Sequence, residues 1–419
     1  MSAEPSRQVR ESVEELYRQE GARVLSSLIR LIGDFDLAED AMQEAFSAAL
    51  QQWPSVGIPA NPRAWLISAG RFKAIDVIRR RARLNERLEV LAARLESEAA
   101  EMTDAGIEDD RLRLIFTCCH PALPEEAQVA LTLREVCGLT TEEIARAFLS
   151  SAPAIAQRIV RAKAKIRDDK IPYELPDPSE LSERLQSVLR VSYLVFNEGY
   201  YASSGYSLTR QPLSLEAIRL GRLLVELLPE SEVFGLLALM LLQESRRAAR
   251  TSPSGDLILL DEQDRSRWNE NLIAEGLDLV QKAFASNRPG PYGFQAAIVA
   301  VHAVSPTSEK TDWARIVSLY DRLLEIHPSS VVELNRAVAV AMRDGAAQGL
   351  VLVDELLANR GLSGYGLAHS ARADLCRRLG QNEEAERSYR RALELATQEP
   401  EKRFLQRRLD ELSVAKTRI

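Results

Sequence analysis

Two short helices separated by a break are encoded at residues 140–167, which read TTEEIARAFLSSAPAIAQRIVRAKAKIR. Thr140 and Glu143 have the spacing of a capping box at the start of the first helix. The break ends on Ser151, a residue type that caps helices, and Pro153 falls in the first turn of the second helix, where a missing N–H costs little. The small Ala145 allows the two helices to approach closely. The sequence therefore predicts a helix-turn-helix.

The second of these helices has two different faces. Its apolar positions follow helical spacing and should pack inward: Ile155, Ile159, Ala162 and Ile166. Its long polar side chains fall on the opposite arc: Gln157, Arg158, Arg161 and Lys165. Cations there can hold phosphates or guanine edges, and glutamine can read adenine, so this face suits a major groove. A solvated basic helix is the alternative, and the two capped starts with a tight turn favour the DNA reader.

An acidic helix is predicted further upstream, over residues 36–50. One face carries Asp36, Asp40, Gln43, Glu44 and Ser47. The opposite face carries Ala38, Ala41, Met42, Ala45, Phe46 and Ala49. The first face could simply be solvated. Its compact set of carboxylates also predicts a docking surface for a protein partner.

The next predicted helix begins after Asn61-Pro62 and ends in Arg79-Arg80-Arg81. Apolar and aromatic residues near its start, beside a dense cationic end, suit single-stranded DNA, where bases stack or enter pockets and cations follow the phosphates. Trp65 itself is interpreted as a core residue in preference to a base platform.

Length and composition place these helices in an all-α chain of several domains. The chain has 419 residues, Leu, Ala, Arg and Glu dominate, and prolines separate helical segments. We predict helical domains at 10–83 and 107–171, a charged connector at 84–106 and a helical extension at 180–419. The net charge of −7 argues against a general nucleic-acid coat. Charge is uneven, however, since residues 34–44 are acidic while 63–94 and 146–170 are basic, which indicates two kinds of partner.

Several other classes of protein are disfavoured. No apolar run approaches the ~20 residues of a membrane span, and the N-terminus does not resemble a signal peptide, so a cytoplasmic location without membrane binding is expected. The cysteines, at positions 118, 119, 137 and 376, lack paired metal-site spacing and are expected to be reduced. Cys118, Cys119 and His120 are adjacent, so they point to different faces of a helix and cannot readily bind one ion. No cofactor, metal or enzymatic activity is predicted.

The extension shows a period of 34 or 35 residues. Gly345 and Gly380 are 35 apart, and Ile316 and Leu350 are 34 apart. This spacing predicts tetratricopeptide-like repeats from about residue 297, with a generic bundle of helical hairpins as the alternative. Residues 196–201, FNEGYY, form an unusual polar-aromatic cluster. They could line a pocket for a small ligand or peptide, or form a packed junction, and we favour the junction.

These pieces, in this order, resemble the extracytoplasmic-function (ECF) RNA polymerase sigma factors. Residues 34–50 look like region 2.2, which binds the β′ clamp of the polymerase core. Residues 61–80 look like regions 2.3 and 2.4, which melt and read the −10 element, and 125–167 look like region 4, which reads the −35 element. The resemblance implies polymerase contacts at Asp36, Asp40, Gln43, Glu44 and Ser47, and −35 contacts at Gln157, Arg158, Arg161 and Lys165. It implies −10 contacts at Arg63, Arg71, Lys73, Asp76, Arg79, Arg80 and Arg81.

One position departs from this family, because Phe72 stands where asparagine is frequent. The extension is similar to that of the sigma-factor subgroup with a tetratricopeptide-like C-terminal domain, in segments such as 196–200 and 261–268, and residues 113–123 look like that subgroup's entry to region 4. The resemblance implies a sigma factor that recruits polymerase to promoters and is regulated by its fused domain, which could bind a protein or a small ligand. The alternative is a helix-turn-helix regulator with tetratricopeptide repeats that does not act as a sigma subunit.

Overall fold

The computed structural model describes residues 4–82, 104–148, 150–201, 209–285, 288–359 and 361–417. Every regular element in these ranges is a helix. The only β-type pairing in these ranges is an isolated bridge between Thr251 and Leu257. The all-α prediction is confirmed. No helix within these ranges is long and apolar enough to cross a membrane. Most of the predicted connector, residues 84–103, lies outside the described part of the chain.

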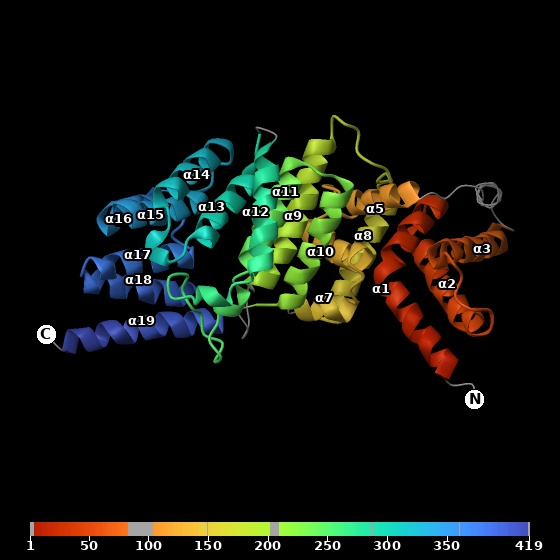
Figure 1. Ribbon diagram of the computed structural model, residues 1–419, viewed down its shortest axis with the longest axis horizontal. Coiled ribbons are helices and arrows are strands. Elements are labelled where there is room, and N and C mark those ends of the chain that lie inside the picture. The colour runs from red at the N-terminus through yellow and green to blue at the C-terminus, as the bar shows by residue number, and fades with distance from the viewer. Residues whose placement is uncertain are drawn as a thin grey trace. The chain divides into compact units, whose positions relative to one another are not determined.

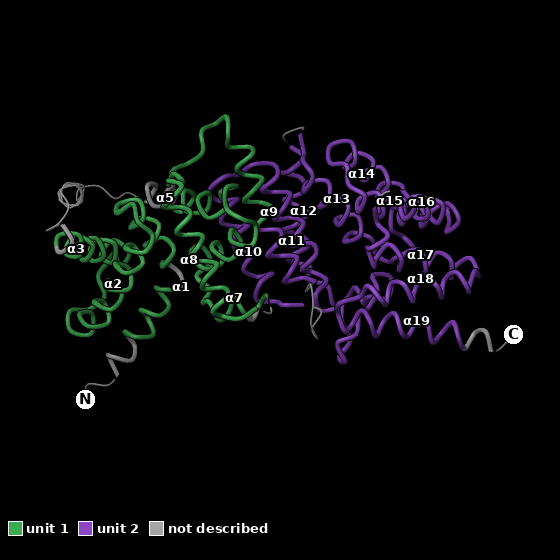
Figure 2. The backbone as a smooth tube through the Cα atoms, turned by 180° about the vertical axis from the view of Figure 1, so that it is seen from behind, with its two compact units in different colours: residues 1–191 green, residues 192–419 purple. Residues whose placement is uncertain are grey.

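The chain divides into two compact units, residues 1–191 and 192–419 (Figure 2). The division falls inside the helix α9 (Leu181–Tyr200), beyond the proline-containing segment at 172–178 where the sequence predicts a boundary. A helix that runs on through this point shares its residues between both units.

The first unit begins with three mutually packed helices, α1 (Glu4–Ile32), α2 (Phe35–Val56) and α3 (Pro62–Ala82), drawn in red to orange in Figure 1. Their core includes the fully buried Trp53 and Leu66. Gly70 permits the close approach of α3, because a Cβ atom there would lie 2.9 Å from a methyl carbon of Leu28 and 3.2 Å from the carbonyl oxygen of Ala41.

The same unit continues with α5 (Asp104–Cys118), α6 (Glu125–Leu131), the π-helical turn η1 (Thr132–Val136), α7 (Thr141–Ala147) and α8 (Ala152–Asp168). Helix α5 packs on α1, and the contact is polar at its centre. The buried carboxylate of Asp110 accepts hydrogen bonds from Ser27 Oγ at 3.0 Å and Arg30 Nε at 3.0 Å. The Tyr173 hydroxyl lies 3.0 Å from the carbonyl oxygen of Ser26 and 2.9 Å from that of Asp110. The charge-assisted bonds to Asp110 and the neutral bonds of Tyr173 together link the two helical groups in one unit.

The second unit is a succession of helices in which each packs on its neighbour in sequence (Figure 1). After the end of α9 its α-helices are α10 (Gln211–Leu227), α11 (Ser231–Glu244), α12 (Glu270–Ala285), α13 (Pro291–Val304), α14 (Trp313–Ile326), α15 (Ser330–Asp344), α16 (Ala346–Asn359), α17 (Gly366–Arg378), α18 (Asn382–Leu395) and α19 (Glu399–Thr417). Short 3-10 turns lie at η2 (Arg247–Ala249), η3 (Arg265–Arg267) and η4 (Ser308–Lys310).

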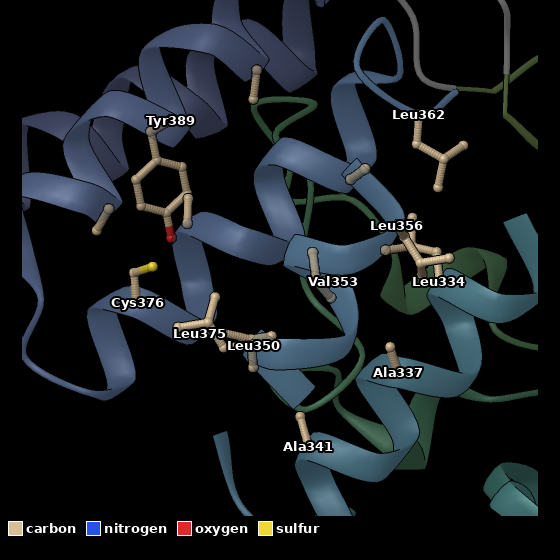
Figure 3. Close-up of a cluster of buried hydrophobic side chains, with 14 of the residues drawn as sticks. Leu334, Ala337, Ala341, Leu350, Val353, Leu356, Leu362, Leu375, Cys376 and Tyr389 are labelled. Carbon is tan, nitrogen blue, oxygen red and sulfur yellow. The ribbon is translucent and has the colours of Figure 1, made fainter. Parts of the chain in front are cut away.

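The C-terminal helices of this unit share an apolar core, part of which is shown in Figure 3. Tyr389 and Cys376 pack in it beside small residues such as Ala385 and Ala392. The two glycines 35 residues apart have left-handed backbones, with φ of 105° at Gly345 after α15 and 74° at Gly380 after α17. These features agree with the spacing seen in the sequence, and the tetratricopeptide assignment itself stays a prediction.

Candidate polymerase and promoter surfaces

The acidic face of α2 is exposed along its whole length. Asp34 caps the helix, since its carboxylate accepts a hydrogen bond of 2.9 Å from the backbone N–H of Leu37. The side chains at 38, 41, 42, 45, 46 and 49 are buried, so the opposite arc faces outward. All five residues predicted to contact polymerase are exposed: Asp36, Asp40, Gln43, Glu44 and Ser47. Helical periodicity thus places them together on one accessible surface.

Helix α3 lies next to this surface. The Lys73 ammonium is 3.5 Å from the Glu44 carboxylate, so the surfaces predicted for polymerase and for the −10 element adjoin. Arg63 is 3.3 Å from Glu20 of α1. Arg71 is only 9% exposed, and its guanidinium lies 5.1 Å from the centre of the Phe72 ring. Arg71 is therefore placed in the packing between helices, unlike the exposed Lys73.

The outer side of α3 combines an aromatic ring with charges. Phe72 is 58% exposed, an unusual degree for a phenylalanine, and Asp76 and Arg79 are exposed as well. The backbone of Arg80 and Arg81 belongs to α3, and their side chains lie outside the described residues. Trp65 is half-buried and packs edge-on against Trp53 with ring centres 5.3 Å apart, as expected for a residue that contributes to the core.

The helix starts predicted for the helix-turn-helix occur in the structure. The backbone N–H of Thr140 donates to Glu143 Oε2 at 2.8 Å, and the N–H of Glu143 donates to Thr140 Oγ1 at 3.2 Å, which completes a capping box. Ser151 Oγ accepts from the N–H of Ala154 at 3.3 Å, and α8 begins at Ala152. Helices α7 and α8 pack on each other, as a helix-turn-helix requires.

The outward face of α8 carries the residues predicted for the −35 element. Gln157 and Arg161 are exposed. Arg158 and Lys165 are partly exposed and form ion pairs, Arg158 with Glu126 at 2.7 Å and Lys165 with Asp169 at 2.5 Å. The apolar residues 155, 159, 162 and 166 are buried on the other side. The face is cationic and accessible, and two of its cations have a carboxylate neighbour that DNA would have to displace.

Lys163 is a buried cation of α8 whose ion pairs no pattern in the sequence predicts. It is 8% exposed and its ammonium lies 2.8 Å from Glu39 of α2 and 3.0 Å from Glu135 of η1. Burial raises the pKa of Glu135 to about 7, against the lowering effect of Lys163. Burial opposes the charge on Lys163 too, but the two carboxylates raise the pKa of its ammonium above the usual value. The position four residues after Ile159 and three before Ile166 was the available signal that it points inward.

The end of α8 also faces the start of α2. Arg167 is 4.0 Å from Asp36, one of the five residues predicted to contact polymerase. A cavity of about 310 Å³ lies beside this pair, lined by residues of α1, α2, α8 and the segment after α8 that includes Tyr173. The acidic surface is therefore exposed, but its first turn has a cationic neighbour within the same unit.

The Cys118-Cys119-His120 segment has the features of core packing. Both thiols are buried, and burial raises the pKa of Cys119 to about 12 and that of Cys118 well above the usual value. Thiols in this state are protonated at neutral pH, whereas metal ligands and nucleophiles must be thiolates. All four cysteines are free, and the described residues include no cluster of three or more His, Cys, Asp or Glu arranged to hold a metal ion.

Three protein families match successive parts of the chain. Residues 16–84 match Sigma-70 region 2, which corresponds to most of α1 together with α2 and α3. Residues 113–166 match Sigma-70 region 4, which includes the helix-turn-helix. Residues 184–284 match DUF6596, a family of unknown function, which spans most of α9 through most of α12.

Known proteins are similar to either nearly the whole chain or a part of it. An uncharacterized protein of Rhizobium meliloti (strain 1021) is 46% identical over 398 residues, 93% of each chain. The probable ECF RNA polymerase sigma factor SigI of Mycobacterium tuberculosis is 30% identical over 163 residues, 38% of this chain and 56% of that protein. The ECF RNA polymerase sigma factor SigE of Mycolicibacterium smegmatis is 30% identical over 159 residues, 38% of this chain and 61% of that protein. No solved structure matches the chain. With both sigma-70 regions in order and relatives of this kind, the chain belongs to the ECF RNA polymerase sigma factors, as a member with a C-terminal extension that contains DUF6596.

Proposed function

We propose that this protein binds the polymerase core through the acidic surface of α2, holds the melted −10 strand with α3, and reads the −35 duplex with the outward face of α8. One observation carries the proposal: all five residues of the α2 face are exposed in a chain that also presents a capped helix-turn-helix. A repressor needs the helix-turn-helix, but it needs no polymerase-docking surface beside a second nucleic-acid surface. The polymerase performs the chemistry, and this chain supplies binding and orientation.

Charge reversal on α2 tests the docking step. Asp40→Arg combined with Glu44→Arg should abolish binding to purified core polymerase and promoter-dependent transcription. The two new guanidinium groups would repel the basic surface of the polymerase that the carboxylates are proposed to attract. Glu174→Arg combined with Glu226→Arg is a matched control, since both residues are exposed, lie outside α2 and change the net charge equally. Retained polymerase binding in the α2 variant would refute the docking assignment and favour a regulator that is not a sigma subunit.

The −35 assignment depends on α8. Arg158→Ala should weaken promoter binding by ~1–3 kcal/mol at the matching base pair if the guanidinium reads a base edge. Arg190→Ala is the control, because Arg190 is exposed on α9 in the same unit and also faces a carboxylate, Glu125 at 4.0 Å. A uniform loss on all DNA sequences would show a phosphate contact in place of base reading.

We further propose that the C-terminal extension regulates the sigma activity and is built from tetratricopeptide-like repeats. Support comes from its size, its 34- to 35-residue spacing and the neighbour-by-neighbour packing of its helices. A chain that ends after α9, at residue 201, should differ from the full chain in transcription in vitro. Hydrogen exchange over α1–α8 must first show that the shortened chain keeps its fold. Equal transcription from both chains would contradict this regulation.

A further inference from the structure

Four arginines gather in the second unit, where the turn after α11 meets the end of α9 and the turn η3. They are Arg246, Arg247, Arg250 and Arg265. The buried carboxylate of Glu244 is held by Arg247 through hydrogen bonds of 2.5 and 2.7 Å. Within the described part of the chain, the other three arginines have no carboxylate at ion-pair distance. The cluster therefore carries an excess of positive charge.

Aromatic rings fix the positions of these guanidinium groups. Arg250 is 8% exposed, stacks 3.7 Å from the centre of the Tyr200 ring and donates a 2.6 Å hydrogen bond to the Tyr200 carbonyl oxygen. Arg246 donates to the Tyr200 hydroxyl at 3.1 Å. The guanidinium groups of Arg246 and Arg265 lie 5.8 and 4.5 Å from the ring centre of Trp268, which is itself 6% exposed. The cations are thus brought to one place by packing and are not free to separate.

Several donors of this cluster have no acceptor among the described residues. They are Nε of Arg246, Nη1 of Arg247, Nη2 of Arg265 and Nε1 of Trp268, all buried. Arg265 does satisfy its other terminal nitrogen, which donates at 2.7 Å to the carbonyl oxygens of both His302 and Ser305 at the end of α13. Buried donors are normally paired, and unpaired donors on charged groups are especially unfavourable.

The electrostatic effect of the cluster extends to its neighbours. Burial, together with Arg246 and Arg265, lowers the pKa of His302 to about 4. Burial, and then Arg246, lowers the pKa of Arg265, while Glu309 opposes the shift. Half-buried cations without counterions are costly in a medium of reduced dielectric constant, and an anion that they bind relieves this cost. Arg246 and Arg265 keep part of their surface exposed, so such an anion can reach them.

We infer that Arg246, Arg265 and the Trp268 N–H, with Arg250 behind them, form a binding site for a phosphate-class oxyanion. A dianion matches the excess of cations, and guanidinium groups bind phosphate oxygens through two parallel hydrogen bonds. The unpaired donors call for oxyanion oxygens, either of inorganic phosphate or of the phosphoryl group of a small molecule. Arg246 connects the polar-aromatic segment 196–201 with segment 261–268, because it donates to the Tyr200 hydroxyl and lies over the Trp268 ring.

The test uses the full-length protein without polymerase or DNA, so its result is independent of the proposed sigma function. Thermal unfolding and equilibrium titration are followed in chloride buffer with added inorganic phosphate, glycerol 3-phosphate or malonate at constant ionic strength. Phosphate or the phosphate ester should raise the melting temperature and protect residues 244–268 from hydrogen exchange. Tighter binding of the ester assigns a phosphorylated small molecule, and tighter or equal binding of phosphate assigns the free ion. A response to malonate alone, or no response at all, would overturn the inference.

Variants locate the site. Arg246→Gln should weaken phosphate binding by about tenfold or more, as expected when a charged donor is lost. Its melting temperature in chloride should stay close to that of the unmodified protein, because the removal of a like charge offsets the lost contacts with Tyr200 and Trp268, so lost binding cannot be ascribed to unfolding. Arg390→Gln is the matched control, an exposed arginine of the same unit that already has a partner in Glu386 at 2.7 Å. An Arg246→Gln protein that responds to phosphate as the unmodified protein does would contradict the site.

Discussion

Lys163 should be essential for the stability of the first unit although it lies in a helix proposed to bind DNA. Lys163→Met keeps the length and the apolar stem of the side chain but removes the ammonium from Glu39 and Glu135. Glu135 then stays buried without its cation, because its side chain is only 2% exposed. Removing one partner of a buried pair typically costs ~3–5 kcal/mol. Glu39 is more exposed and can regain water, so we expect about 3 kcal/mol, near the lower end.

Protonation of Glu135 limits the stability that Lys163→Met loses. A neutral Glu135 requires no partner, so the loss should be larger at pH 8 than at pH 6. Glu135→Gln should restore much of the stability when combined with Lys163→Met, with a coupling free energy of ~1–3 kcal/mol in the double-mutant cycle.

Urea unfolding at both pH values measures the free energy, and hydrogen exchange of α8 and η1 assigns the change to the first unit. Lys282→Met is a suitable control, since Lys282 forms an exposed pair with Asp278 in α12 and should change stability by less than ~0.5 kcal/mol. A Lys163→Met loss below ~1 kcal/mol, or additive effects in the cycle, would refute the buried ion pair.

Three further predictions concern pH, packing and promoter melting. The folded-state pKa of Glu135 is raised, so its contribution to stability is complete below its ordinary pKa near 4.5 and is lost as the pH rises through about 7. Urea titrations should show that the free energy of unfolding declines by an amount on the order of 3 kcal/mol over this range, and Glu135→Gln should remove the decline. A free energy of unfolding that does not change with pH would contradict the prediction. Gly199→Ala should destabilise the second unit by ~1–3 kcal/mol or more, because the new Cβ would lie 2.2 Å from the backbone nitrogen of Ser214; unchanged thermal unfolding would disprove this close contact. Phe72→Ala should weaken binding of a premelted −10 strand by ~1–3 kcal/mol while duplex binding is kept, and equal losses on both DNAs would argue against base stacking.

Local features of the chain were predictable because they depend on residues close in sequence. The capping box at Thr140, the cap at Ser151 and the two faces of α2 follow from spacings of three or four residues, and all occur in the structure. The all-α class follows from the same periodicity. The role of Trp65 in packing was predicted as well, from its position at the start of α3.

Residues whose setting depends on distant segments were harder to interpret. Arg71 and Lys73 are both cations of the same predicted helix, yet Arg71 is buried and Lys73 is exposed. The face of α3 that carries Arg71 is packed against neighbouring helices. The four arginines of the cluster contact residues as far apart in sequence as Tyr200 and Ser305, so no short motif could reveal it. Tyr200 of segment 196–201 is held by two of these arginines, and the prediction of a packed junction in preference to a ligand pocket stays untested.

The helices, their caps and the side chains that share a face can be predicted from the sequence alone, since they are consequences of the 3.6-residue turn and of hydrogen bonds within a few residues. Tertiary structure decided which face of each helix meets which partner. Lys163 shows the difference: periodicity turns it inward, but only the tertiary fold brings Glu39 of α2 and Glu135 of η1 to it, the two carboxylates that allow a charge to be buried there.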